Sequence, residues 1–316
     1  MKTLANSLVS LALLAASIYV LEWDRLSLVL RQVDALIFGL AVLLCLAIFM
    51  VLAVRWFQII KPFAPLDFAQ HCAYFFYSVF LNSFTPATVG GDTYRFVYLK
   101  SRATNGMSVV MAIVKERLCG VVAHLLAYLV CLTVLLSSGR PPMYLQGDLF
   151  LAMGGLALTV MVGVAIVQSP FLAFVQDLAW VSTREPVRLG LAYLKTAVRF
   201  QSVAEFVSLL GYSVVGIMVW ALTMLIIAFD LRIDINWPAL GTVVILTELL
   251  RLVPITFQGI GIREGAFAYL FQLLGVSPES GFVLALVGYL ALSVAIVLCC
   301  PLSWLIARYA HSSLVR

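Results

Sequence analysis

Long uninterrupted runs of apolar residues dominate the pattern along this chain. Six of them are long enough to cross a lipid bilayer as helices, because a helical span needs about 20 residues. They cover roughly residues 3–21, 34–60, 107–137, 149–167, 203–229 and 281–309. None has the ten-residue alternation that is typical of membrane barrel strands. The pattern therefore predicts an all-α integral membrane protein with about six full transmembrane helices.

Two further apolar segments, at about 68–84 and 239–257, run into breaks that contain Pro and Gly. The first break reads P-x3-GGD-x2-R from Pro86 to Arg95, and the second reads PITFQGIGIREG from Pro254. Backbone groups that a break frees cost several kcal/mol if they face lipid, so a break must lie inside protein or line a wet cavity. We therefore predict two re-entrant hairpins of broken helix, in addition to the full spans.

The two broken segments occupy corresponding places in the chain. Each follows two spans, carries a Pro and two Gly, and then has an arginine and an acid within a few residues. This order is the outline of an inverted repeat with discontinuous helices near the bilayer midplane. It predicts a single transmembrane domain over 1–316, with half-repeats at about 1–137 and 149–309.

Composition and charge agree with a membrane location. Apolar residues make up 63% of the chain and charged residues 11%, and the mean hydropathy is +1.08. If the N-terminus is cytoplasmic, one side of the membrane carries Lys2, Arg55, Lys61, Lys100, Arg102, Arg184, Arg188, Lys195, Arg199, Arg308 and Arg316. The net charge of +5 then follows the positive-inside rule and needs no nucleic-acid partner. We expect a bacterial cytoplasmic membrane protein with both termini in the cytoplasm.

The segment 168–202 mixes Trp, Phe and Leu with four basic residues. Such a mixture is typical of an amphipathic helix that lies on an anionic membrane surface. A solvated connector whose charges stop translocation explains the same composition. We expect a cytoplasmic amphipathic loop, and the second interpretation stays open.

Cysteine and histidine spacing indicates no metal site. The cysteines lie inside apolar stretches without a CxxC pair, which predicts small buried hydrophobic residues; they are Cys45, Cys72, Cys119, Cys131, Cys299 and Cys300. The three histidines, His71, His124 and His311, are scattered. The Gly259-x-Gly261 pair follows no strand, so it is not a dinucleotide fingerprint. No cofactor is expected.

The breaks are expected to present helix N-termini to each other. Asp92 and Thr93 suit the N-cap of a helix that starts after Gly91. The stretch from Ile262 has helical apolar spacing, with Glu264 in its first turn. A helix N-terminus offers free N–H groups and the positive end of the dipole, so both breaks suit an anion.

An arginine lies in the first turn of each half-helix, Arg95 in one and Arg263 in the other. An arginine at membrane depth costs about 2.5–3.5 kcal/mol on insertion scales, which indicates a specific role. Phosphate matches the planar guanidinium fork. The alternative is that Arg95 with Asp92, and Arg263 with Glu264, merely neutralise each other or cap the half-helices.

Other charges fall inside the spans. Lys115, Glu116 and Arg117 are consecutive, so they cannot all point one way, and they can line a head-group path or simply pair. Glu116 shares a helix face with Gly120 and His124, and Glu248 shares one with Arg251. The candidate substrate-binding residues are Gly90, Gly91, Asp92, Arg95, Glu116, Glu248, Arg251, Gly259, Gly261, Arg263 and Glu264.

Four of these motifs together resemble the lysylphosphatidylglycerol synthase/flippase transmembrane family. They are RW at 55–56, P-x3-GGD-x2-R at 86–95, ERL-x-G at 116–120 and PITFQGIGIREGAF at 254–267, and the resemblance covers about residues 5–310. It implies a flippase-like domain that moves lipids between leaflets, with a site at Asp92, Arg95, Glu116, Arg263 and Glu264. Relatives act in aminoacyl-phosphatidylglycerol, hopanoid or polyprenyl-lipid pathways, so the resemblance does not specify the lipid.

The expected function is therefore a lipid flippase for an anionic, phosphate-bearing lipid, and not an enzyme. Because the printed sequence ends at Arg316, we expect no soluble aminoacylating domain and no synthase activity. Two alternatives stay open: a membrane-embedded transferase that acts on a lipid-linked substrate, and a scaffold partner of a separate lipid-modifying enzyme. The sequence leaves the oligomeric state open.

Overall fold

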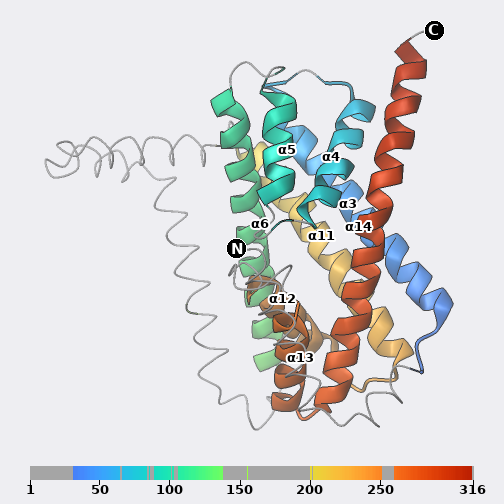
Figure 1. Ribbon diagram of the computed structural model, residues 1–316. Helices are drawn as coiled ribbons and strands as arrows, with labels where there is room; N and C mark the ends of the chain where they lie inside the picture. Colours follow the sequence, from blue (N-terminus) through green and yellow to red (C-terminus); the bar gives the residue numbers. More distant parts are fainter. Residues whose placement is uncertain are drawn as a thin grey trace, which may run out of the picture.

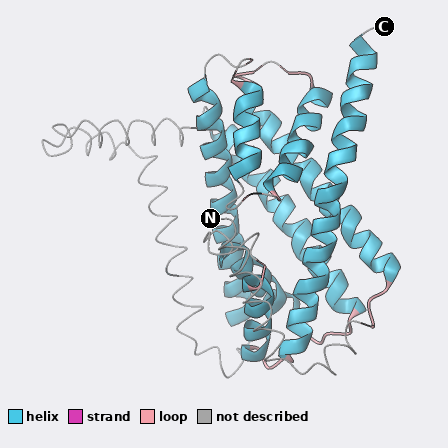
Figure 2. Ribbon diagram, viewed as in Figure 1, coloured by secondary structure: helices cyan, strands magenta, loops and turns pink. Residues whose placement is uncertain are grey.

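The computed structural model describes residues 31–64, 66–83, 85, 89–100, 102, 106–137, 155, 200, 202–250 and 260–314. Over these residues the secondary structure is helical and contains no strand (Figure 2). The predicted span 3–21 lies outside the described residues, and so do the predicted span 149–167, apart from residue 155, and the predicted amphipathic loop 168–202, apart from residues 200 and 202.

Four helices are long and apolar enough to cross a membrane. They are α3 (Ala35–Ile60), α6 (Gly106–Ser137), α11 (Val203–Asp230) and α14 (Pro278–Leu314). Their positions confirm the four predicted spans that fall on described residues. The chain is therefore a helical integral membrane protein.

Each broken segment forms two short helices. The first consists of α4 (Phe68–Asn82) and α5 (Val89–Leu99), and the second of α12 (Trp237–Leu250) and α13 (Ile262–Leu273). The helices of each segment pack on each other, α4 on α5 toward one end of the molecule and α12 on α13 toward the other (Figure 1). The start of α13 at Ile262 was predicted correctly, whereas Pro86 and the stretch 251–259 lie outside the described residues.

The helix contacts repeat between the two halves of the chain. The packing of α4 on α14 has its counterpart in α12 on α6, and that of α3 on α14 in α11 on α6. In the same way, the packing of α4 on α5 corresponds to that of α12 on α13. The packing of α5 on α6 corresponds to that of α13 on α14. Helices α3 and α11 pack on each other at the centre of this arrangement. Each described helix of the first half thus has a counterpart in the same chain order among the described helices of the second half.

The helix starts are encoded locally by short polar residues. Side-chain oxygens of Asp34, Asp67 and Ser202 accept hydrogen bonds from backbone N–H groups in the first turns of α3, α4 and α11. Asn236 does the same for α12 through the N–H of Ala239. Such caps satisfy donors that a helix start leaves without partners.

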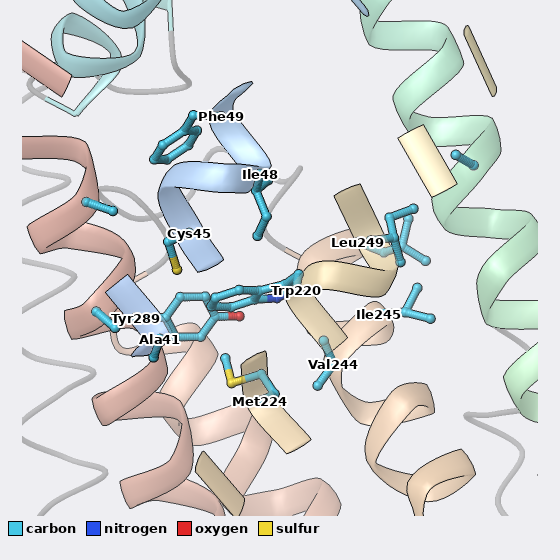
Figure 3. Packing of buried hydrophobic residues seen from close by; sticks show 14 of the residues in the cluster. Ala41, Cys45, Ile48, Phe49, Trp220, Met224, Val244, Ile245, Leu249 and Tyr289 are labelled. Atoms are coloured by element: carbon cyan, nitrogen blue, oxygen red, sulfur yellow. The ribbon is translucent and has the colours of Figure 1, made fainter. Parts of the chain in front are cut away.

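A continuous apolar core joins the two halves. Figure 3 shows Trp220 and Met224 of α11 close to Ala41 and Cys45 of α3. All six cysteines are free, four of them are buried and two are partly buried. This agrees with the prediction that they pack as small hydrophobic residues.

Candidate functional site

A cavity of about 300 Å³ lies between helices of both halves. Most of its described wall is apolar and comes from α3, α4, α6, α11, α12 and α14. The charged side chains that line it are Arg55, Arg95, Arg117, Glu116 and Glu248. A chamber that combines an apolar wall with a few convergent charges is suited to an amphiphilic ligand.

Glu116 is held between two arginines in this wall. Nη1 of Arg95 donates to Oε2 at 2.6 Å, and Nη2 of Arg55 donates to Oε1 at 3.1 Å. All three residues are at most 7% exposed. A buried charge is tolerated only when it is paired and hydrogen-bonded, and here one carboxylate serves two guanidinium groups. The triad ties α3, α5 and α6 together.

The guanidinium of Arg95 has a second set of partners. Its Nε donates to Oγ of Ser78 at 2.8 Å. Its Cζ lies 4.6 Å from the ring centroid of Phe75 and 5.1 Å from that of Trp56. Contact with aromatic faces favours a desolvated cation. Arg95 is therefore fixed by α4 and α3 as well as by Glu116.

A buried hydrogen-bond chain orients Trp56. Its Nε1–H donates to the Tyr74 hydroxyl at 2.7 Å, and that hydroxyl lies 3.0 Å from Nδ1 of His71. Nε2 of His71 lies 3.0 Å from the carbonyl oxygen of Ala53. Because an indole N–H only donates and a carbonyl only accepts, Tyr74 must donate to Nδ1 and His71 must carry its proton on Nε2. Every polar atom of this chain is then satisfied.

The start of α5 differs from the prediction. The helix begins at Val89, before Gly91, so Asp92 lies in its first turn and is not its N-cap. The caps come from across the break: Oγ1 of Thr85 accepts from the Gly90 N–H at 2.8 Å, and Oδ1 of Asn82 accepts from the Gly91 N–H at 2.7 Å. These N–H groups have protein acceptors, so they are not free for an anion.

Asp92 instead pairs with Arg117. Nη2 of Arg117 donates to Oδ2 of Asp92 at 2.7 Å. The other oxygen lies 3.8 Å from Nη1 of Arg95, which is too long for a hydrogen bond. The neighbouring Lys115 pairs with Glu205 at 2.9 Å. The three consecutive charges of α6 therefore point to different partners, as helical geometry requires.

The second break is capped by its own acid. Gly261 has φ of +84°, which favours glycine, and its N–H donates to Oε2 of Glu264 at 2.7 Å. The capping alternative for Glu264 is thus the observed one. The Cζ atom of Arg263 lies over the Tyr289 ring, 4.0 Å from the ring centroid. The Tyr289 hydroxyl donates a hydrogen bond to Oε1 of Glu248 at 2.9 Å. Glu248 lines the cavity, whereas Arg263 and Glu264 are not among its described lining residues.

The structure therefore separates the predicted site residues. Arg95, Glu116 and Glu248 line one cavity, while Gly90, Gly91, Gly261 and Glu264 serve the backbone at the breaks. Among the described lining residues Arg55 and Arg117 accompany Arg95, whereas Arg263 is not one of them. Arg251 and Gly259 lie outside the described residues. Gly120 and His124 line the cavity beside Glu116, as their spacing predicts.

Arg55 is the main cavity residue that the sequence analysis did not include in the candidate site. It was counted only among the charges of the cytoplasmic face; it is 7% exposed and donates from Nη1 to Oγ of Ser213 on α11 at 2.8 Å. Its position inside the apolar run 34–60, next to Trp56, was the available signal. Ser213 and Trp220 also line the cavity, and no sequence signal had indicated them.

The observations above define the class of protein: a helical membrane protein whose two halves have matching helix contacts and enclose a cavity with charged side chains. Residues 4–300 of the 316-residue chain match the family described as the lysylphosphatidylglycerol synthase TM region, and the chain belongs to this family. No curated protein and no solved structure shows significant similarity to the chain. The family confirms the expected resemblance, and it is consistent with a role in lipid handling.

Proposed function

We propose that this protein is a flippase, which moves a phosphate-bearing lipid between the leaflets of the membrane. The observation that carries the proposal is the cavity of about 300 Å³, whose wall combines apolar side chains with Arg55, Arg95 and Arg117. Guanidinium groups match phosphate oxygens in geometry and charge. The apolar part of the wall suits the glycerol and acyl atoms that follow the phosphate.

The arrangement of the helices supports transport by alternating access. We infer that α4–α5 and α12–α13 are re-entrant hairpins of an inverted repeat, because their contacts correspond and they lie toward opposite ends of the molecule (Figure 1). In such repeats one half rocks against the other around a site between them. The hydrogen bond from Arg55 on α3 to Ser213 on α11 crosses this boundary.

We place the protein in the bacterial cytoplasmic membrane, with both termini in the cytoplasm. The support is the uneven distribution of Lys and Arg along the sequence. The basic residues at 184–199 belong to the side that is rich in positive charge. An anionic lipid is the proposed partner, and we propose transport without chemical conversion of that lipid.

Leaflet-resolved lipid movement in proteoliposomes tests the proposal. We expect Arg95→Gln and Arg117→Gln each to slow movement at least about tenfold, because each removes a charge-assisted contact worth about 1.5–3 kcal/mol. The matched control is Arg308→Gln, since Arg308 is exposed and stacks on Trp304 away from the cavity. Wild-type rates in both cavity variants would reject the role. A chemically changed lipid would favour the transferase alternative.

A further inference from the structure

The ion pair of Asp92 with Arg117 is the most exposed one between described residues. The side chain of Arg117 is 48% exposed and that of Asp92 is 20% exposed, and Arg117 lines the cavity. Arg95 and Glu116 provide the contrast, because their side chains are only 5% and 7% exposed. An ion pair that water reaches is weak, since water screens the charges and competes for the hydrogen bonds. A ligand in the cavity can therefore replace the contact of Asp92 with Arg117.

The carboxylate of Asp92 is only half satisfied. Its Oδ2 accepts from Nη2 of Arg117 at 2.7 Å, whereas its Oδ1 is buried and has no hydrogen-bond partner among the described residues. Nη1 of Arg95 lies 3.8 Å from Oδ1 and donates instead to Glu116 at 2.6 Å. Each oxygen of Glu116, by contrast, accepts from an arginine. A buried acceptor without a donor is costly, so Asp92 is the more easily displaced of these two acids.

An anion in the cavity competes with Asp92 for the same guanidinium group. Phosphate and carboxylate oxygens both accept from guanidinium N–H groups in similar geometry. Two anions at one arginine also repel each other. A phosphate that binds at Arg117 therefore favours the separation of Asp92 from it, and departure of the phosphate lets Asp92 return.

We propose that Asp92 is a displaceable counter-ion of Arg117, which weakens anion binding and so lets the cavity release its lipid. Without a lipid, Asp92 neutralises Arg117; with a lipid, it competes with the phosphate. A transport site needs this balance, because a ligand must bind firmly enough to enter and weakly enough to leave. The inference rests on the proposed function, because it assumes that Arg117 contacts a phosphate-bearing lipid.

Lipid binding by the full chain tests the proposal. The probe is phosphatidylglycerol, which carries one negative charge, and native mass spectrometry gives its Kd. We expect Asp92→Asn to bind this lipid about fivefold more tightly, the upper end for a solvent-exposed ion pair. Asp92→Glu keeps the charge and should bind like the wild type. In the Arg117→Gln background, Asp92→Asn should have no effect, because the group for which Asp92 competes is gone.

The matched control is Glu205→Gln. Glu205 pairs with Lys115, which lies two positions before Arg117 on α6, and it is not among the described residues of the cavity wall. Loss of this more distant charge should change the Kd by less than about twofold. An unchanged or higher Kd in Asp92→Asn would overturn the proposal, and so would the same tightening in Glu205→Gln or in the Arg117→Gln background. Asp92→Ser removes the same charge and takes the place of Asp92→Asn if that variant does not fold.

Transbilayer movement in proteoliposomes separates this role from a structural one. We expect Asp92→Asn to lower both the maximal rate and the lipid concentration that gives half of it, because tighter binding slows release. A lower rate with a higher half-saturating concentration means that Asp92 only positions Arg117, and it would overturn the proposal. No movement by the wild type rejects the flippase, whereas movement by the wild type without tighter binding in Asp92→Asn rejects only the counter-ion.

Discussion

Glu116 accepts hydrogen bonds from two buried arginines, so one negative charge stabilises the junction of three helices. Glu116→Gln keeps the size of the side chain but removes the negative charge that Arg55 and Arg95 share. Breaking a buried ion pair by removing one partner costs about 3–5 kcal/mol. We expect a loss of roughly 3 kcal/mol in the free energy of unfolding, measured by thermal or denaturant unfolding in detergent.

Asp234→Asn is the control for this prediction. Asp234 is exposed in the connection before α12, where loss of a charge should change stability by less than about 0.5 kcal/mol. If Glu116→Gln unfolds at the same temperature as Asp234→Asn, the triad does not stabilise the fold.

Single residues were predictable where a charge interrupts an apolar run. Charges inside spans are rare and costly, so Arg95 and Glu116 could be identified without a structure. Arg55 could not, because it lies in the last part of α3, where a long side chain can also reach the membrane surface. Trp220 carries no signal at all, since a tryptophan in an apolar helix is ordinary.

At the scale of elements, the first hairpin depends on close contact between α5 and α4. A Cβ at Gly91 would overlap the carbonyl oxygen of Ser78 and would lie 2.5 Å from Oδ1 of Asn82. The backbone of α4 cannot yield as a flexible side chain can. We expect Gly91→Ala to destabilise the protein by about 2 kcal/mol, within the range of overpacked sites.

Gly39→Ala gives the opposite expectation. Gly39 lies in α3, and a Cβ there meets no atom within 4 Å. Alanine is the better helix former by roughly 0.5–1 kcal/mol, so this variant should be neutral or slightly more stable. Thermal unfolding of both variants in the same detergent measures the difference. Equal stability of the two variants would show that α4 and α5 do not pack this closely.

The breaks were predictable because Pro and Gly interrupt apolar runs, but their capping was not. Thr85 and Asn82 precede α5 by several residues, and their side-chain oxygens accept hydrogen bonds from the N–H groups of Gly90 and Gly91. Sequence patterns for helix capping consider only the residue directly before the first turn. They therefore predicted Asp92 as the N-cap of this helix. The N–H groups of Gly90 and Gly91 thus have protein acceptors, and the positive charge among the described cavity residues comes from arginine side chains.

At the scale of the whole molecule, the two halves enclose one chamber. The order of spans and breaks predicted that they correspond, and the helix contacts repeat in the same order. The sequence did not show which charges would meet, because this depends on how α3, α6 and α11 cross. The chamber itself is therefore the central claim, and a variant that fills it without removing a charge tests that claim.

Gly120 allows this experiment. It lines the cavity, and the nearest atom to a Cβ at this position is Nη1 of Arg55 at 3.8 Å. Gly211 on α11 is exposed and has no atom within 4 Å of its Cβ, so Gly211→Leu adds the same side chain outside the cavity. The measurement is transbilayer lipid movement in proteoliposomes that contain equal amounts of folded protein. The account predicts that Gly120→Leu stops movement and that Gly211→Leu does not; wild-type movement in Gly120→Leu would contradict it.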